Sequence, residues 1–308
     1  MILTKEGKVV KGLGGLYEVR VHEGEAIERY SVRAKGSLHR DEEKLLVGDN
    51  VRLSVDTEVP DGVVISEILP RRNSLIRPSM ANLDTLFIVL AAKKPAPVLE
   101  TVDKLIAIAE YNSISPVVVI TKSDIDDSAA EEYARIYKSV GIPTFITSSK
   151  TEEGICELSE YISSTVNDGA TAAFSGASGV GKSTLMNALF PTLSLATADI
   201  SHKIERGKHT TRHVEIFDLG SGFLADTPGF SLIDFERFDF FSLDSLESTF
   251  REIAPFRGKC RYSDCSHVGE SEAECAVALA AARGEIEPTR LESYRSIYRT
   301  LKSKNNYS

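Results

Sequence analysis

The sequence predicts a multidomain fold: a small all-β domain, then a central α/β domain, then a helical C-terminal domain. Three observations predict it. Residues 1–70 show short strand patterns without a convincing helix, and residues 81–235 alternate strand and helix patterns around a glycine-rich loop. Residues 236–308 become helical and carry a cluster of Cys and His. A length of 308 residues suggests two or three domains, on a prior of about 150 residues for one domain.

The N-terminal segment predicts a small barrel. Its alternating apolar and polar residues, bounded by turn signals, predict strands at 15–21, 26–34, 50–55 and 62–69. About five short strands indicate a small barrel, for which the OB-fold is one candidate. Residues 71–80 are expected to form a basic linker.

The central segment predicts a parallel sheet. Residues 85–91 are continuously apolar, as in a strand buried on both faces. Strand and helix patterns then alternate, which predicts a parallel sheet covered on both sides. Further strands are expected at 116–120, 143–146 and 172–175, and helices at 98–111, 129–140, 155–166 and 182–189.

Composition limits the class of protein. The net charge of −9 argues against general coating of nucleic acid, although local basic patches can still meet phosphate. No apolar run approaches the roughly 18 residues of a membrane span, and the N-terminus lacks the apolar core of a signal peptide. We therefore expect a cytoplasmic protein without a membrane partner, and a monomer.

A phosphate-binding loop begins at Gly176 and is the strongest motif. Its glycines allow backbone N–H groups to surround phosphate oxygens. Lys182 can reach the β- and γ-phosphates, and the Ser183 hydroxyl can bind Mg²⁺. The alternative is a coincidental glycine-rich turn, which the flanking strand and helix patterns disfavour. The predicted nucleotide-binding residues here are Gly176, Ala177, Ser178, Gly179, Val180, Gly181, Lys182, Ser183 and Thr184.

Two downstream segments complete a triphosphate site. Asp226 follows an apolar stretch, where a carboxylate can hold Mg²⁺, and the N–H of Gly229 can meet the γ-phosphate. The polar loop 202–213 resembles a switch loop, in which a Thr binds Mg²⁺. Thr211 is the preferred Mg²⁺ ligand, and Thr210 is the alternative.

Catalysis needs a group that orients the attacking water. Phe230, directly after Gly229, cannot do so, and His209 is the nearest candidate. An ordinary exposed loop histidine is the alternative for His209. The predicted catalytic residues are therefore His209, Lys182 and Thr211.

A guanine-reading segment precedes the phosphate loop. Asp124 can accept hydrogen bonds from N1–H and N2–H₂ of guanine, a pattern that adenine lacks. Thr stands at position 121, where such segments usually carry the Asn that braces the site. A capped helix start is the alternative. The predicted guanine-binding residues are Thr121, Lys122, Ser123 and Asp124, and, in a second loop, Ser148, Ser149 and Lys150.

The order of these motifs is the most specific feature. In an ordinary GTPase the guanine-reading segment follows the phosphate loop, whereas here residue 121 precedes residue 176. This order predicts a circularly permuted GTPase domain.

A metal site is predicted in the C-terminal segment. Three of the chain's four cysteines lie with one His in a short window. Three sulfurs and an imidazole can close a tetrahedral zinc site, which leaves no position for water and so makes the site structural. Buried free cysteines are the alternative. The predicted ligands are Cys260, Cys265, His267 and Cys275.

Together the motifs and their order resemble the ribosome small-subunit-dependent GTPase A family of bacteria, over essentially the whole chain. The resemblance implies an OB-fold, a circularly permuted GTPase and a zinc domain, in that order. It implies GTP or GDP, Mg²⁺ and one structural Zn²⁺ as ligands. It also implies binding to the 30S ribosomal subunit and 16S rRNA, a role late in subunit maturation, hydrolysis stimulated by the subunit, and a hydrolytic role for His209.

Two other functions stay open from the sequence. One is a non-catalytic RNA-binding scaffold that uses guanine nucleotide as a structural ligand. Phe230 and Thr121, which depart from the usual GTPase residues, favour this alternative. The other is a signalling GTPase, which leaves the barrel and the metal site unexplained. Basic residues can contact phosphate or be ordinary solvated charges. They are Arg71, Arg72, Arg77, Lys203, Arg206, Lys208, Arg212, Arg290, Arg295, Arg299, Lys302 and Lys304.

Overall fold

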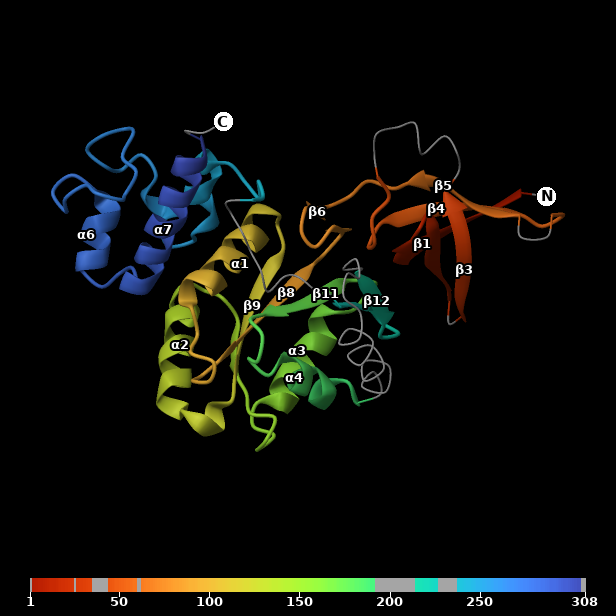
Figure 1. The fold of residues 1–308 in the computed structure, drawn as a ribbon, viewed down its shortest axis with the longest axis horizontal. Helices are drawn as coiled ribbons and strands as arrows, with labels where there is room; N and C mark the ends of the chain where they lie inside the picture. Colours follow the sequence, from red (N-terminus) through yellow and green to blue (C-terminus); the bar gives the residue numbers. More distant parts are fainter. Residues whose placement is uncertain are drawn as a thin grey trace. The chain divides into compact units, whose positions relative to one another are not determined.

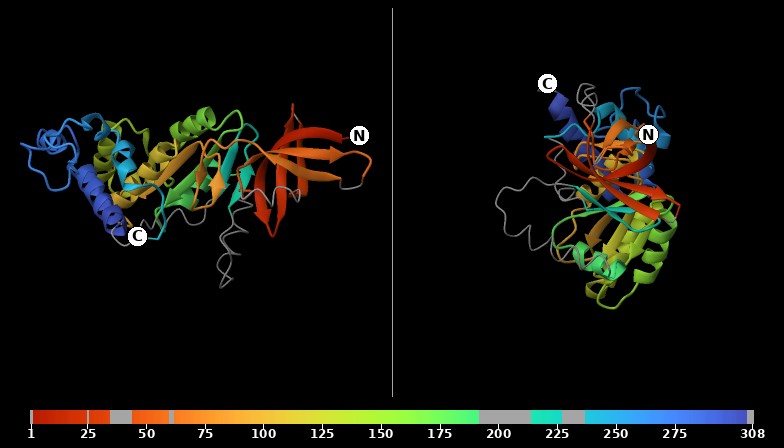
Figure 2. Two further views of the ribbon diagram at one scale, coloured as in Figure 1. Left: turned by 90° about the horizontal axis from the view of Figure 1, so that it is seen from above. Right: turned by 90° about the vertical axis from the view of Figure 1, so that its right-hand side faces the viewer.

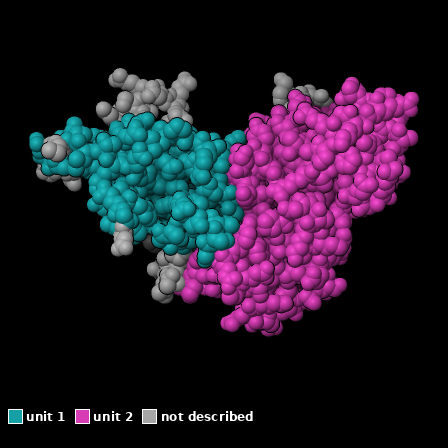
Figure 3. Space-filling view, turned by 180° about the vertical axis from the view of Figure 1, so that it is seen from behind, with its two compact units in different colours: residues 1–85, 162–174, 200–230 teal, residues 86–161, 175–199, 231–308 magenta. Residues whose placement is uncertain are grey.

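Two compact units make up the chain. The computed structural model describes residues 2–24, 26–34, 44–59, 62–191, 214–226 and 237–305. Unit 1 comprises residues 1–85, 162–174 and 200–230, and unit 2 comprises residues 86–161, 175–199 and 231–308 (Figure 3). The domain boundaries expected from the sequence, at 1–70, 71–80, 81–235 and 236–308, remain predictions.

Unit 1 contains a closed five-stranded barrel (Figures 1 and 2). Hydrogen-bonded neighbours follow the circuit β1-β2-β3-β5-β4, and β4 pairs back to β1, so no strand of the circuit is an edge. This closed antiparallel barrel with one parallel pair, β3 with β5, has the strand order of an OB-fold. The strands are β1 (Ile2–Leu13), β2 (Leu16–Glu23), β3 (Ala26–Ala34), β4 (Asn50–Asp56) and β5 (Val63–Ile68).

The burial of the barrel strands explains why one of them was not predicted. Val19 and Val21 of β2, and Leu53 of β4, are at most 1% exposed, as their alternation predicts. Strand β1 was not predicted, because only residues 8–10 of its twelve are buried and its remaining residues are largely polar. Gly14 and Gly15 both adopt positive φ, 58° and 79°, which suits the two-residue turn between β1 and β2.

The barrel sheet continues into three more strands of unit 1. β12 (Glu215–Asp218) pairs with β1 through Lys11 and Glu215, and it forms a hairpin with β13 (Phe223–Asp226). β13 runs parallel to the first residues of β11 (Thr171–Gly176). The linker holds the short strands β6 (Ser74–Leu75) and β7 (Met80–Ala81).

Lys8 of β1 lies buried beside the start of β11. Its Nζ donates hydrogen bonds to Thr171 Oγ1 at 2.8 Å and to the Gly169 carbonyl at 3.1 Å. Burial lowers the pKa of Lys8 to about 8. The barrel is therefore fastened to β11 by a lysine whose charge costs free energy in the folded state.

Unit 2 contains a mostly buried sheet with helices. β8 (Thr85–Ala91), which belongs to unit 2 from Leu86 on, is buried at every residue, as its apolar run predicts. Its neighbour is β9 (Ser115–Thr121), which runs parallel to β10 (Thr144–Ile146). The helices are α1 (Leu99–Tyr111), α2 (Asp127–Ser139), α3 (Ile155–Thr165) and α4 (Lys182–Leu189), with a short 3₁₀ turn η1 (Ser123–Ile125).

The C-terminal part of unit 2 is helical and packs on α1. It contains the 3₁₀ segments η2 (Leu243–Thr249) and η3 (Ala254–Phe256), then α6 (Ala276–Ala282) and α7 (Pro288–Asn305). Both η2 and α7 contact α1. Among the described helices, none combines the length and the apolar character that crossing a membrane requires.

A buried ion-pair network joins α7 to α1. Arg290 of α7 is 1% exposed; its Nη1 donates to Asp103 Oδ1 of α1 at 2.6 Å, and its Nε donates to Glu252 Oε1 at 2.7 Å. The guanidinium also lies 4.6 Å from the centre of the Phe250 ring. Burial raises the pKa of Asp103. Arg290 is thus neither a solvated charge nor a phosphate contact, contrary to both sequence interpretations.

Candidate functional site

The phosphate loop lies between β11 and α4, as the sequence predicts. Gly176 ends the strand with φ of 153°, and a Cβ there would lie 2.3 Å from the Val89 carbonyl oxygen. Gly179 and Gly181 adopt φ of 80° and 97°. Glycine is therefore required by a close approach at the first position and favoured by positive φ at the other two.

The loop leads directly into a helix N-terminus. Lys182 is the first residue of α4, and its Nζ lies 3.5 Å from the Gly176 carbonyl oxygen. Ser183 and Thr184 follow in the first turn and are exposed, whereas Leu185 is buried. A helix N-terminus with an exposed hydroxyl and an ammonium group suits a phosphate and its metal ion.

Thr121 ties the guanine-reading segment to the phosphate loop. It ends β9, is 3% exposed, and its Oγ1 donates to the Val180 carbonyl in the phosphate loop. The Leu90 carbonyl lies 3.2 Å from the same hydroxyl. The sequence indicated that Thr in place of Asn removes an amide that normally braces the site. The structure shows a brace, made by the hydroxyl.

Lys122 makes a second tie between the same segments. Its Nζ donates to the Gly179 carbonyl at 2.7 Å and to the Lys94 carbonyl. Its backbone adopts φ of 61°, a left-handed conformation that turns the chain from β9 into η1. Both ties end on carbonyl oxygens of the phosphate loop, so Thr121 and Lys122 connect the guanine-reading segment to it at two points.

Asp124 is held by the second predicted guanine loop. Ser148 Oγ donates to Asp124 Oδ1 at 2.8 Å, and Lys150 Nζ lies 3.5 Å from Asp124 Oδ2. The Ser148 hydrogen bond, and then the Lys150 charge, lower the pKa of Asp124. The carboxylate is therefore ionised at neutral pH, which is the form that can accept two hydrogen bonds from guanine. Ser149 lies between these partners and is half-buried.

Two residues that were not predicted from the sequence shape these loops. Glu153 Oε2 accepts a hydrogen bond from Ser123 Oγ at 3.1 Å, and its backbone carbonyl accepts one from the Ser148 N–H at 3.0 Å. Gly154 has φ of 68°, and a Cβ there would lie 2.0 Å from the Ile146 carbonyl oxygen. The acid–glycine pair after the Ser-rich loop was the available signal.

The remaining nucleotide predictions fall largely outside the described residues. His209, Thr210, Thr211, Gly229 and Phe230 lie outside them. Asp226 ends β13, and its backbone pairs with Glu215, but its side chain is outside the described atoms. Their roles in metal binding and catalysis remain predictions.

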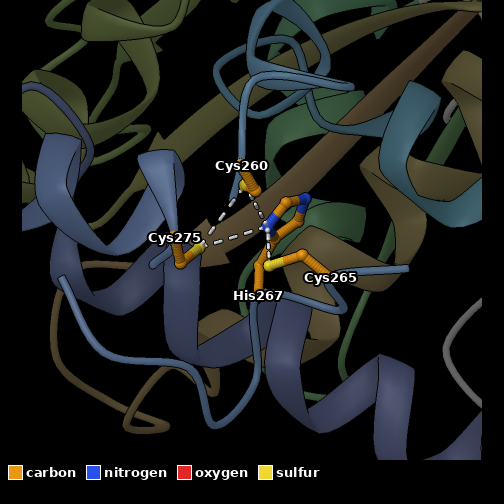
Figure 4. Close-up of side chains that lie close together, drawn as sticks. All are labelled: Cys260, Cys265, His267 and Cys275. Atoms are coloured by element: carbon orange, nitrogen blue, oxygen red, sulfur yellow. Dashed lines mark hydrogen bonds between the residues drawn. The ribbon is translucent and has the colours of Figure 1, made fainter. Parts of the chain in front are cut away.

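The four predicted metal ligands meet in one place (Figure 4). Their ligand atoms all lie within 4.8 Å of one another. His267 Nδ1 lies 3.3 Å from Cys275 Sγ, 3.4 Å from Cys265 Sγ and 3.6 Å from Cys260 Sγ, and the Cys260 and Cys275 sulfurs are 3.9 Å apart. A tetrahedral Zn²⁺ with ordinary bond lengths requires roughly 3.8 Å between sulfurs and roughly 3.6 Å between sulfur and nitrogen. The four residues therefore fit zinc.

The surroundings of the cluster favour a metal ion. Backbone N–H groups of Ala276 and Ala278 lie 3.3 and 3.4 Å from the Cys260 and Cys275 sulfurs, as suits thiolates. His267 Nε2 lies 3.7 Å from the buried Glu247 Oε1, so a carboxylate faces the ring nitrogen that does not face the sulfurs. Burial raises the pKa of the Cys265 thiol to about 12, so a cation is needed to hold it as thiolate.

Glu270 fixes the loop between the metal ligands. Its carboxylate accepts hydrogen bonds from the Ser266, Val268 and Gly269 N–H groups and from Ser266 Oγ. The pKa of Glu270 falls to about 2, because these hydrogen bonds outweigh its partial burial. Arg295 of α7 donates from Nε to the His267 carbonyl at 3.0 Å, so this basic residue supports the cluster.

Family models cover most of the chain. Residues 68–236 match the model of the RsgA GTPase, and residues 6–64 match that of the RsgA N-terminal domain. The chain belongs to the RsgA GTPase family. It is 37% identical over 303 residues to "Small ribosomal subunit biogenesis GTPase RsgA 2" of Listeria monocytogenes, covering 97% of this chain and 98% of that protein. It is 36% identical over 310 residues to the RsgA of Agathobacter rectalis, covering 98% and 99%.

Solved structures agree with this assignment. The chain resembles YloQ, described as a circularly permuted GTPase, with a TM-score of 0.78, 30% identity and coverage of 98% and 96%. It resembles YjeQ of Thermotoga maritima with a TM-score of 0.78, 31% identity and coverage of 97% and 99%. The predicted fold class is therefore confirmed, including the permutation. As a member of the RsgA GTPase family, the chain is a GTP-hydrolysing enzyme.

Proposed function

We propose that this chain is a GTPase of small ribosomal subunit biogenesis, which binds the 30S subunit through 16S rRNA and hydrolyses GTP faster when bound. The similarity to proteins named for that role, over 97% of the chain, carries the proposal. The intact brace between guanine-reading segment and phosphate loop favours it over a scaffold with a degenerate site. We further propose that the protein acts in the cytoplasm, as a monomer and late in maturation.

The nucleotide site is proposed to work by positioning and charge. Lys182 and Ser183 stand at the helix N-terminus where the phosphates and Mg²⁺ would bind, with Asp226 and Thr211 as the further proposed Mg²⁺ contacts. Asp124 would accept the two guanine donors while Ser148 holds its carboxylate. RNA contacts would order the loop that carries His209 and bring its imidazole to the attacking water.

The metal centre is proposed to hold one structural Zn²⁺. Cys260, Cys265, His267 and Cys275 would fill all four tetrahedral positions, which leaves none for water or substrate. The ion would supply folding free energy to a segment rich in turns and 3₁₀ helix.

Turnover of GTP and ATP, each with and without purified 30S subunits, tests the proposal. We expect GTP turnover to rise with 30S and ATP turnover to stay at background. His209→Ala should lose most of the stimulated turnover while its GDP affinity stays that of the wild type. Equal use of ATP and GTP, or GTP turnover insensitive to 30S, would overturn the proposed function. Unchanged turnover of His209→Ala would remove His209 from the mechanism.

A further inference from the structure

A pocket of about 300 Å³ is lined in part by Cys260, Cys265 and His267 of the Cys/His cluster, and no step of GTP binding uses it. Tyr262, Tyr294 and Tyr298 line it together with Arg257. Tyr262 is 47% exposed, and Tyr294 is 3% exposed, so one ring faces solvent and the other lies within the core. The volume is at the lower end for small-ligand pockets, roughly 300–1,000 Å³, which suits a single flat ring.

Arg257 lines this pocket, and further basic residues lie close to its tyrosines. Exposed Arg257, Lys259 and Arg261 fall within six residues of chain that end at Tyr262. The Arg261 guanidinium lies 5.7 Å from the centre of the Tyr262 ring, and Lys302 Nζ lies 5.7 Å from that of Tyr298. Cations beside exposed aromatic rings are the combination that binds single-stranded nucleic acid, because bases stack on the rings and phosphates meet the cations.

The charges divide the pocket into two environments. Asp244, Glu247 and Asp264 line it, and their carboxylates disfavour a phosphate inside. Carboxylate oxygens do accept hydrogen bonds from the amino groups of bases, such as N4 of cytosine. A base inside the pocket and its phosphate outside, near the Arg257–Arg261 stretch, would satisfy both sets of charges.

Neighbouring groups hold the Tyr262 ring in place. Tyr262 lies between the ligands Cys260 and Cys265, and its hydroxyl donates to Glu274 Oε1 at 3.3 Å. Tyr294, at the base of the pocket, packs edge-on against Phe250 with ring centres 5.4 Å apart. Because these rings are already held, binding of a base would order few side chains. Little of the free energy of base–tyrosine stacking would then be lost to side-chain entropy.

We infer that this pocket takes one unpaired, amino-bearing base of a single-stranded RNA segment, with the Arg257–Arg261 stretch on the adjoining phosphates. The inference rests on the proposed role at ribosomal RNA and names a feature that the RNA must present. A base within a duplex is excluded, because its faces are already stacked and its pairing edge is occupied.

The test is fluorescence anisotropy of the full-length, zinc-loaded protein with labelled oligocytidylate, oligouridylate and an RNA hairpin of the same length. We expect oligocytidylate to bind more tightly than either other probe. Tyr262→Ala and Tyr298→Ala should each weaken oligocytidylate binding by roughly 5- to 150-fold, the factor that loss of one base–aromatic stack gives. Tyr298→Phe keeps the ring and should bind like the wild type.

Tyr111→Ala is the matched control, since Tyr111 is 46% exposed and lies on α1. Zinc content is measured for every variant to confirm that the cluster is intact. Equal binding of hairpin and single strand, equal binding of the two oligonucleotides, or wild-type affinity in both Tyr→Ala variants would overturn the inference. Ultraviolet cross-linking of oligocytidylate to the unmutated protein needs no variant: cross-links at Tyr262 or Tyr298 support the pocket, and cross-links confined to other segments overturn it.

Turnover of GTP with 30S subunits, measured on the same samples, separates the two proposals. Stimulated turnover in the wild type, together with binding that ignores both tyrosines, overturns the pocket and leaves the proposed function standing. Unstimulated turnover, together with tyrosine-dependent binding of oligocytidylate, overturns the proposed function and supports the pocket as an RNA site.

Discussion

Replacing Thr121 by valine removes the hydroxyl that joins the guanine-reading segment to the phosphate loop. Valine has nearly the same shape, so packing at this 3% exposed position is preserved. The hydrogen bond from Oγ1 to the Val180 carbonyl is lost. One such bond contributes about 0.5–1.5 kcal/mol net, which corresponds to a factor of roughly 2–13 in an equilibrium constant.

We expect the affinity for GDP to fall by that factor, because the phosphate loop must then be ordered by the nucleotide itself. Titration calorimetry at one temperature and salt concentration measures it. Thr121→Ser keeps a hydroxyl and should bind GDP nearly as the wild type does.

Thr144→Val is the matched control. Thr144 is 8% exposed, and its Oγ1 donates to the Ile142 carbonyl at 2.9 Å, at the start of β10. It should lower the free energy of unfolding by a similar amount without changing GDP affinity. Wild-type GDP affinity in Thr121→Val, or an equal loss in Thr144→Val, would refute the reasoning.

Three further predictions concern the metal centre, the buried network and the barrel. Glu247→Gln should weaken zinc binding by roughly 10- to 100-fold in a chelator competition, because the carboxylate supports His267. Arg290→Met should lower the free energy of unfolding by roughly 3–5 kcal/mol in urea, because it leaves two buried carboxylates without their cation. The pKa of Lys8, about 8 when folded, lies below its ordinary 10.5, so its charge destabilises the fold fully below pH 8 and progressively less up to pH 10.5. Relative to Lys8→Met, the wild type should therefore gain up to about 3 kcal/mol across that window in denaturant unfolding.

Variants of an exposed ion pair serve as controls for the first two predictions, and the pH dependence serves as the control for the third. Glu292→Gln should leave zinc affinity unchanged, and Arg299→Met should cost less than about 1 kcal/mol, because these two residues form an exposed ion pair. Zinc affinity that is equal in Glu247→Gln and Glu292→Gln would contradict the first prediction. An equal loss of unfolding free energy in Arg290→Met and Arg299→Met would contradict the second prediction. The third would be contradicted if the difference in unfolding free energy between the wild type and Lys8→Met did not change with pH.

The sequence predicted those parts of the site that depend on backbone geometry or ligand chemistry. Gly176 must be glycine beside β8, and the Cys275 sulfur lies 3.3 Å from His267 Nδ1 in a ligand set typical of metal sites, so motif and spacing were sufficient. The role of Thr121 was not predictable, because it depends on which carbonyl lies opposite a hydroxyl across 59 residues of chain.

Two other features, strand β1 and the role of Arg290, were not predicted because they depend on tertiary contacts. Strand β1 is too polar to show alternation, yet it pairs with two strands of the barrel and with β12. Arg290 belongs to a basic helix, and nothing in its local sequence indicates Asp103, 187 residues earlier. Tertiary contacts decided both cases, and periodicity contains no information about them.

The Arg290 network has a mechanical consequence. Sliding α7 along α1 by even part of a helical turn would separate Arg290 from Asp103 inside the protein, where unpaired charges cost several kcal/mol. A movement of the C-terminal segment about α1 alone would therefore cost that free energy. We therefore expect a displacement of α1 to move α7, and the Cys/His cluster that Arg295 of α7 contacts, together with it.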